Sequence, residues 1–163
     1  MSSHTHANHL PAFDSPHERE EIGGQLQGLL VELIDLSLLG KQLHWSVAGP
    51  HFRSLHLQLD ELIDSWRDLA DTVAERAVAI GYFPDGQSGA VAAATPLHAV
   101  ERGELRDAVV VRELTQRLAE VAEHAREKMD RLGELDAASQ DVVIEVIREL
   151  EKQLWMVRVQ FEE

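Results

Sequence analysis

One stretch of the sequence carries imidazole and carboxylate side chains at helical spacing. Its members follow one another at steps of 4, 4, 7 and 4 residues: His56, Asp60, Asp64, Asp71 and Glu75. These steps are compatible with one side of a helix that has 3.6 residues per turn. Imidazole and carboxylate donors without sulfur suit ferrous iron, zinc or manganese, and argue against copper(I) or an iron–sulfur cluster. A charged face in contact with solvent is the alternative interpretation.

The spacing is also symmetrical about its centre. The residue numbers of His56 and Glu75 add to 131, and so do those of Asp60 and Asp71. If two copies of the helix cross antiparallel, as in an isologous dimer, His56 of one copy lies opposite Glu75 of the other, and Asp60 lies opposite Asp71. One chain cannot close such a cluster, because Asp60 and Asp71 lie about 16 Å apart along a helix that rises 1.5 Å per residue. Either the residues are unrelated, or they form a site between subunits where a divalent metal offsets the repulsion among carboxylates.

The composition narrows the classes of protein to consider. The chain has 163 residues, enough for one domain with a sizeable core. Fifteen Lys and Arg residues against 29 Asp and Glu residues give a net charge of −14, which argues against a default nucleic-acid binder. The absence of cysteine excludes disulfides and thiolate chemistry. Because we find neither an uninterrupted apolar membrane span nor an N-terminal secretory signal, we expect a soluble, cytoplasmic protein with no membrane contact.

Apolar residues recur at three- and four-residue steps in four long segments, which predicts four helices. The segments run from about residue 18 to 43, 51 to 80, 107 to 132 and 136 to 161. The connection between the second and the third exceeds 20 residues, and a short helix over residues 88–94 would shorten it. We therefore predict an all-α, ferritin-like four-helix bundle whose long crossover makes the second and third long helices parallel neighbours. Residues 1–17 are expected to form a flexible, histidine-containing tail before a domain of residues 18–163.

A longer motif surrounds the symmetrical stripe. It has the form His-x11-His-x3-Asp-x10-Asp-x3-Glu and runs from His44 to Glu75. Within and beside it lie His44-Trp45, Gly49, Phe52, His56, Asp60-Glu61, Asp71 and Glu75-Arg76. With these features the sequence resembles the Dps family, the miniferritins named as DNA-binding proteins from starved cells. The helical layout extends the resemblance over roughly residues 20–160.

The resemblance implies a hollow shell of twelve subunits with a ferroxidase centre at each two-fold interface. Carried over residue by residue, His44, His56 and Asp60 come from one subunit, and Asp71 and Glu75 come from its mate. Ferrous iron would be oxidised there, preferably by hydrogen peroxide, and stored as ferric mineral in the cavity, which protects against oxidative stress. The protein would thus be an enzyme, an oxidoreductase acting on metal ions. The sequence has no Glu-x-x-His pair for a metal site within each bundle.

Three residues near the motif are expected to support it. Lys41, one turn before His44, would either pair with an acid across the interface or be an exposed lysine. Trp45 would pack beside the site or be a purely structural aromatic residue. Trp66, at the centre of the symmetrical spacing, is expected near the two-fold axis, and ordinary core packing is the alternative.

The junction between the third and fourth long helices is rich in acids. In the resembling family this junction lines a three-fold pore through which iron enters, and a ring of carboxylates attracts cations. The pore candidates are Asp136 and Asp141, with Asp130 and Glu134 behind them. Helix capping by Asp136 and simple solvation of the other acids are the alternative.

The predicted tail is the other segment that offers metal ligands. It carries His4, His6, His9 and His17. Such a group of histidines would bind zinc or iron, or would be incidental to a disordered segment.

Two further functions stay open beside the ferroxidase. One is a redox-inactive cage that sequesters metal, and the other is a nucleoid-associated protein that protects DNA. Peroxide consumption coupled to the loss of ferrous iron separates the ferroxidase from the first. The absence of Lys and Arg from residues 1–18 disfavours the second, because DNA-binding members of the resembling family use basic tails.

We predict weak or absent DNA binding at neutral pH, because the acidic chain repels phosphate. A gel-shift assay at neutral pH and moderate salt should leave the DNA unshifted. Below about pH 6.5 the tail histidines gain charge and should partly restore binding. A strong shift at neutral pH would contradict this prediction.

Overall fold

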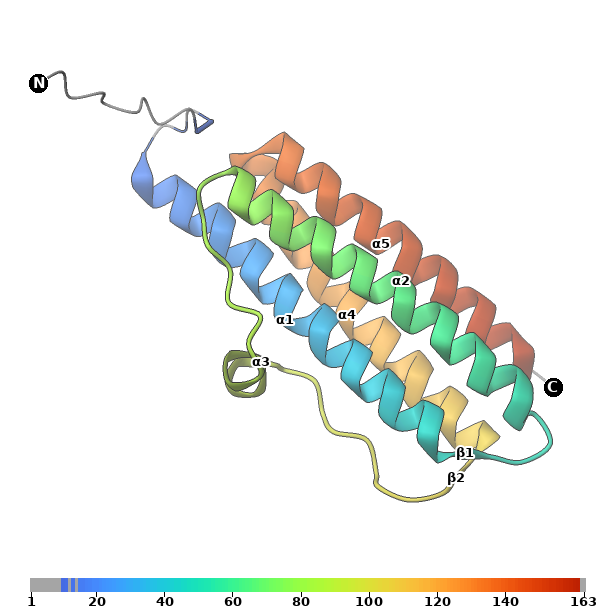
Figure 1. The fold of residues 1–163 in the computed structure, drawn as a ribbon. Coiled ribbons are helices and arrows are strands. Elements are labelled where there is room, and N and C mark those ends of the chain that lie inside the picture. Colours follow the sequence, from blue (N-terminus) through green and yellow to red (C-terminus); the bar gives the residue numbers. More distant parts are fainter. Residues whose placement is uncertain (1–9, 12, 14, 162–163) are drawn as a thin grey trace, which may run out of the picture.

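The computed structural model describes residues 10–11, 13 and 15–161, and these form an all-α fold. Four long helices lie side by side: α1 (Pro16–Ser46), α2 (Phe52–Ala79), α4 (Asp107–Leu135) and α5 (Ala137–Arg158) (Figure 1). A short helix, α3 (Ser88–Ala94), interrupts the crossover, and a 3-10 turn, η1 (Val159–Phe161), follows α5. The predicted four-helix bundle with a short extra helix in its crossover is confirmed.

The first helix begins two residues before the predicted domain boundary. The hydroxyl of Ser15 accepts a hydrogen bond from the backbone N–H of Glu18 at 3.2 Å, and Pro16 occupies the first helical position. Both are favoured at a helix start, because the first N–H groups have no partner within the helix. His17, predicted to belong to the tail, therefore lies in the first turn of α1.

α2 and α4 are not packed as neighbours, in contrast to the prediction. α1 packs against α2 and α4, and α5 packs against α4 and α2, so α2 and α4 occupy diagonal corners of the bundle. Both start at the same end, which makes them parallel, but the expectation that they are neighbours is wrong. The crossover packs along the outside of α1, and this route carries the chain past α1 before α4 begins (Figure 1).

The crossover is fixed to the bundle by polar contacts. The side chain of Gln27 in α1 bonds to the backbone N–H and the carbonyl of Asp85, both at 2.8 Å. Thr95 donates to the Asp35 carboxylate at 2.5 Å, and Arg117 of α4 donates to the carbonyl of His98 at 2.9 Å. A connection with this many anchors is an ordered part of the fold.

The crossover ends in a two-stranded parallel sheet that the sequence did not predict. β1 (Val47–Ala48) directly follows α1, and β2 (Leu105–Arg106) directly precedes α4. Val47 pairs with Leu105 and Ala48 with Arg106. Strands of two residues are too short to show an alternating pattern, but they join the start of α4 to the link between α1 and α2.

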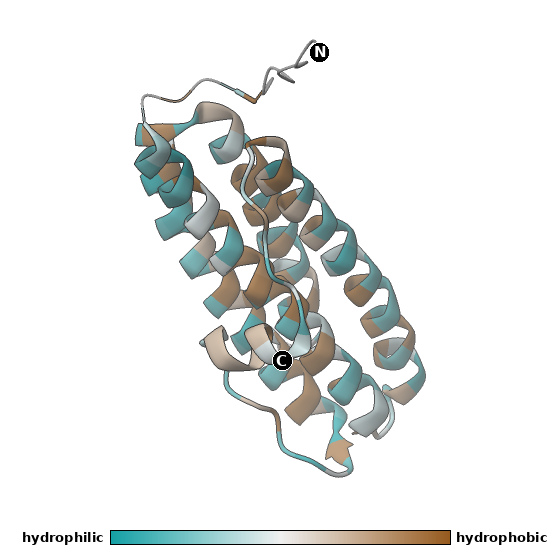
Figure 2. Ribbon diagram, turned by 60° about the vertical axis from the view of Figure 1, so that its left-hand side comes forward, coloured by the Kyte–Doolittle hydropathy of each residue, from teal (hydrophilic) through white to brown (hydrophobic). Residues whose placement is uncertain are grey.

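Apolar side chains fill the space between the four long helices. Each long helix combines hydrophobic and hydrophilic residues, as helices with a buried face do (Figure 2).

Of the described helices, α1 alone is long and apolar enough to cross a membrane by length and composition, but 56% of its most apolar window is buried. Its composition follows from its position, because it contacts α2, α4 and the crossover at once.

Replacing Leu59 with Asp should unfold the domain, because Leu59 is 0% exposed and the new carboxylate would be buried without a partner. We expect a loss of about 4 kcal/mol or more in the free energy of unfolding. Circular dichroism during urea titration measures it. Leu57→Asp, on the same helix at a position that is 48% exposed, is the matched control and should keep the helical signal. Equal stability of the two variants would contradict this assignment of the core.

Candidate metal centre

Three of the five predicted ligands come together where α1 ends and α2 begins. His44 lies in the last turn of α1, and His56 and Asp60 lie in the first turns of α2. One ligand atom from each lies within 4.8 Å of the others, and among the described residues this is the one such group of His, Asp and Glu side chains. His44 is buried, whereas His56 and Asp60 are partly exposed. The cluster thus has one buried member, His44, and two members that solvent reaches, His56 and Asp60.

The two histidines hold each other in place. The Nδ1 atom of His44 lies 2.9 Å from the carbonyl oxygen of His56, and the Nδ1 atom of His56 lies 2.9 Å from the carbonyl oxygen of His44. The imidazole rings stack with centroids 3.6 Å apart. Because a carbonyl oxygen only accepts, each Nδ1 must donate, and the neutral ring then keeps its lone pair on Nε2. This arrangement fixes the tautomer that binds a metal.

Asp60 is held by a lysine of its own chain. The Lys41 ammonium contacts the Asp60 carboxylate, and this hydrogen bond lowers the pKa of Asp60 more than burial raises it. A positive charge on the His44 or His56 ring also lowers the pKa of Asp60. Lys41 is thus part-buried and paired within its own chain, which does not fit an exposed lysine, while a pairing across the interface stays a prediction.

The other two predicted ligands stay apart from this cluster. Asp71 and Glu75 are exposed on α2, about 16 Å from Asp60 or farther at 1.5 Å per residue. Asp71 lies on the edge of a mostly apolar groove of about 440 Å³ between α1, α2 and the start of the crossover. One chain therefore offers two separate half-sets of ligands, one where α1 meets α2 and the other farther along α2.

The two tryptophans near the motif differ in burial. Trp45 is 71% exposed, so most of its surface is left uncovered by the described chain. Trp66 is 0% exposed and donates its indole N–H to Gln153 of α5 at 2.7 Å, so core packing, the alternative interpretation, applies. An α-helix turns by about 100° per residue, so a residue halfway between His56 and Glu75 lies on the side of α2 opposite to these two residues. Trp66, at this halfway point, therefore points into the bundle.

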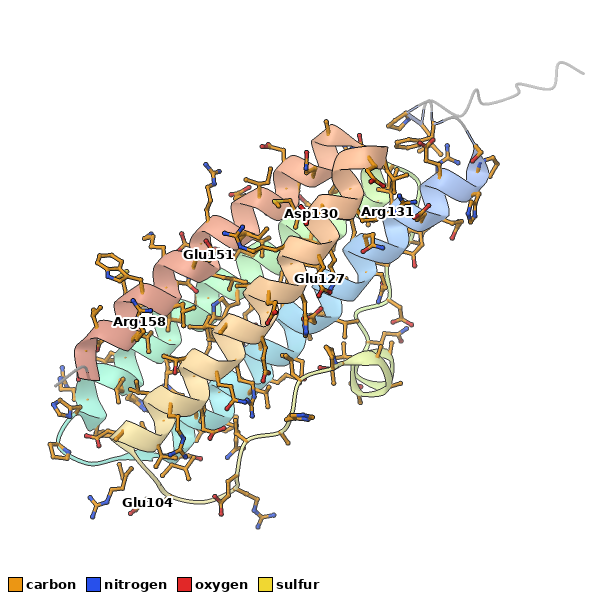
Figure 3. All side chains as sticks on the ribbon, turned by 180° about the vertical axis from the view of Figure 1, so that it is seen from behind. Glu104, Glu127, Asp130, Arg131, Glu151 and Arg158 are labelled. Atoms are coloured by element: carbon orange, nitrogen blue, oxygen red, sulfur yellow. The ribbon has the colours of Figure 1, made fainter. Side chains whose placement is uncertain are left out.

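The predicted pore residues lie at the opposite end of the bundle from His44. Asp136 caps α5, since its carboxylate accepts the backbone N–H of Ser139 at 3.0 Å, and it also accepts from Arg76 of α2 at 2.7 Å. The capping role named as the alternative is thus present for Asp136. Asp141, Asp130 and Glu134 are exposed, and Asp130 lies with Arg131 near the C-terminal end of α4 (Figure 3). Arg131 pairs with Glu134.

The histidines outside the motif have various positions. His17 is exposed on α1, and His4, His6 and His9 lie outside the described residues, so a metal site in the tail stays a prediction. His124 bonds to the buried carboxylate of Glu32 at 2.7 Å, and His51 bonds to Asp107 at 2.9 Å. Neither pair is visible as a pattern in the sequence, because their members are 92 and 56 residues apart and no local spacing connects them.

The chain is similar to ferritin-like proteins in both sequence and structure. The model of the ferritin-like domain family matches residues 24–163. The DNA protection during starvation protein of Mycolicibacterium smegmatis is 33% identical over 150 residues, which cover 91% of this chain and 81% of that protein. A tetragonal form of Mycobacterium smegmatis Dps superposes with a TM-score of 0.89 at 31% identity, covering 100% of this chain and 96% of that chain. Dps from Microbacterium arborescens in the high iron form gives 0.87 at 29% identity, covering 94% and 100%.

Asp136→Ala should lower the stability of the bundle in a pH-dependent way. Burial alone would raise the pKa of Asp136, but the hydrogen bonds from Ser139 and Arg76 outweigh burial and lower it. The stabilisation by the carboxylate, about 1–2 kcal/mol for a cap, is present at neutral pH. It is lost as the pH falls below the ordinary value of about 3.9 and through the lowered pKa.

Urea titrations at pH 7 and at successively lower pH test this. Wild type and Asp136→Ala should differ at pH 7 and converge in acid, whereas the exposed control Asp141→Ala should match wild type throughout. A difference for Asp136→Ala that does not change with pH would contradict the role of its charge.

Proposed function

This chain belongs to the Dps family of ferritin-like proteins, and we propose that it is a ferroxidase that oxidises ferrous iron and stores the ferric product in a cage. The family implies iron binding, and the donor set of this chain is suited to that metal. The observation that supports the proposal most strongly is the pair of histidines locked as Nε2 ligands beside a carboxylate. A cage that only stored metal would need acidic walls, but not two oriented imidazoles.

The site is completed by a second subunit. His44, His56 and Asp60 supply one half, and Asp71 and Glu75 of the mate supply the other. This arrangement is supported by the exposure of Asp71 and Glu75 and by the distance that separates them from Asp60 along one helix. An antiparallel two-fold contact between α2 helices brings the halves together twice per dimer. We propose that six such dimers form a dodecameric shell.

The donors divide the chemistry between them. Glu75 and Asp60 bridge or bind the more tightly held iron, Asp71 serves the second position, and the imidazoles of His44 and His56 maintain affinity for the ferrous state. Lys41 neutralises Asp60 before iron arrives, and the incoming cation must displace it from the carboxylate. Iron loading therefore exchanges one positive partner of Asp60 for another, so the carboxylate always has a cationic partner.

The oxidation consumes iron and peroxide together. Two ferrous ions give one electron each to hydrogen peroxide, the O–O bond breaks, and with two protons its oxygens leave as two water molecules. Both ions become ferric, hydrolyse and move into the cavity as mineral. Because the electrons are taken as a pair at one site, no hydroxyl radical leaves it. Protection of DNA, the role in the names of the relatives, would then follow from removing both reactants in the cytoplasm, without DNA contact.

Asp60→Ala and Glu75→Ala should each abolish fast iron oxidation while leaving the assembly intact. Stopped-flow absorbance of ferric product after mixing with ferrous iron and peroxide measures the rate, and native mass measures the assembly. Glu127→Ala, which removes an exposed carboxylate from α4, is the control and should oxidise iron at the wild-type rate. Wild-type rates in either ligand variant would contradict the site.

Co-assembly of the two inactive variants tests where the site lies. In a mixed dimer, one site combines an intact His44–His56–Asp60 half with an intact Asp71–Glu75 half, whereas the other has lost both carboxylates. Random mixing should therefore restore about a quarter of the wild-type rate, since half of the dimers are mixed and each has one complete site. No recovery would place each site within a single chain.

A further inference from the structure

Two helices of the bundle start at the same place and share one carboxylate. α2 begins after His51, whose side chain provides no capping hydrogen bond, and α4 begins at Asp107 without a capping side chain before it. The Oδ2 atom of Asp107 accepts the backbone N–H of His51 at 3.0 Å and lies 2.9 Å from its ring nitrogen Nδ1. The Oδ1 atom accepts the N–H of Ala108 at 2.9 Å. One negative charge thus serves two helix N-termini, where it is favoured.

The loop between α1 and α2 is shaped to admit this carboxylate. Gly49 has φ +123, a conformation that residues with a side chain rarely adopt, and a Cβ there would lie 3.0 Å from the Asp107 carboxyl carbon. The backbone pairs Val47–Leu105 and Ala48–Arg106 align the same two segments just before the contact. Asp107 is 8% exposed, and the hydrogen bonds from His51 are the main reason that its pKa is lowered.

The same loop joins the two metal-binding histidines. His44 precedes it and His56 follows it, and each ring bonds to the backbone of the other. The start of α2 must therefore keep its position relative to the end of α1 for both bonds to form. Asp107 is not the hydrogen-bond partner of either ring, yet it accepts the backbone N–H of His51, five residues before His56, and so ties the start of α2 to α4.

We propose that Asp107 is a positioning residue for the iron site, which fixes the start of α2 so that His44 and His56 stay aligned as Nε2 ligands. The proposal rests on the proposed function. It assigns part of the site's geometry to a residue in a different helix, 56 positions from His51 along the chain.

Cobalt(II) binding by the assembled protein, followed by visible absorption, tests the proposal without any oxidation step. Asp107→Ala should weaken cobalt binding about tenfold to a hundredfold, the range for losing a residue that orients a metal-ligating histidine. Asp107→Asn keeps an oxygen that accepts the His51 N–H and should stay close to wild type. The matched control is Asp35→Ala, which also loses a carboxylate holding a connecting segment, at Thr95, and it should bind cobalt normally.

A crystal structure of Asp107→Ala gives a second readout that needs no metal. The two His44–His56 backbone bonds should lengthen beyond hydrogen-bonding distance. Should Asp107→Ala fail to fold, Gly49→Ala displaces the same carboxylate from the other side and should show the same two effects. Wild-type cobalt binding with both bonds intact would overturn the proposal, and so would an equal loss in Asp35→Ala. If wild type itself bound no cobalt, the proposed function would fail, and the crystal structure alone would decide about Asp107.

Discussion

The reciprocal hydrogen bonds between His44 and His56 are the contact on which the geometry of the candidate site rests. The carbonyl of His44 lies in the last turn of α1, where backbone carbonyls have no partner within the helix. The ring of His56 meets that need, and in doing so it fixes its own tautomer. One interaction therefore completes a helix end, joins two helices and prepares two metal ligands. The site is prepared by the fold before any iron arrives.

The second constraint is that α2 must serve two surfaces. Its core side carries Leu59, Trp66 and Val73, all fully buried, and its outer side carries all the predicted ligands except His44. A helix of 28 residues can present both along its whole length, because residues on each side recur every three or four positions. The bundle core then holds the outer surface rigid without contributing a ligand. Because the two sides are separate, substitutions on the core side of α2 should affect folding, whereas substitutions on its outer side should affect iron chemistry.

Local patterns in the sequence predicted the four long helices and the crossover helix, whereas the grouping of His44, His56 and Asp60 came from the resemblance to the Dps family, because periodicity within one helix says nothing about its contact with another. Features that depend on packing were not predicted. The diagonal placement of α2 and α4 depends on the route of the crossover, and the Asp107–His51 pair joins segments 56 residues apart. Trp66 points into the core because the midpoint of a spacing along a helix need not lie on the same side as its ends, and its distance from a two-fold axis stays a prediction. The joining of the two ligand halves stays a prediction, since it concerns a second chain.

The broad apolar surface of α1 has a consequence for biosynthesis. This helix is translated first, but its neighbour α4 begins only at Asp107, 61 residues after α1 ends at Ser46. At 5–20 residues per second, the ribosome takes roughly three to twelve seconds to make that interval. α2 is completed within that interval and covers part of α1, but the side of this strongly apolar helix that packs against α4 stays uncovered until α4 is made. Early pairing of α1 with α2 is then the first protection against aggregation on the ribosome.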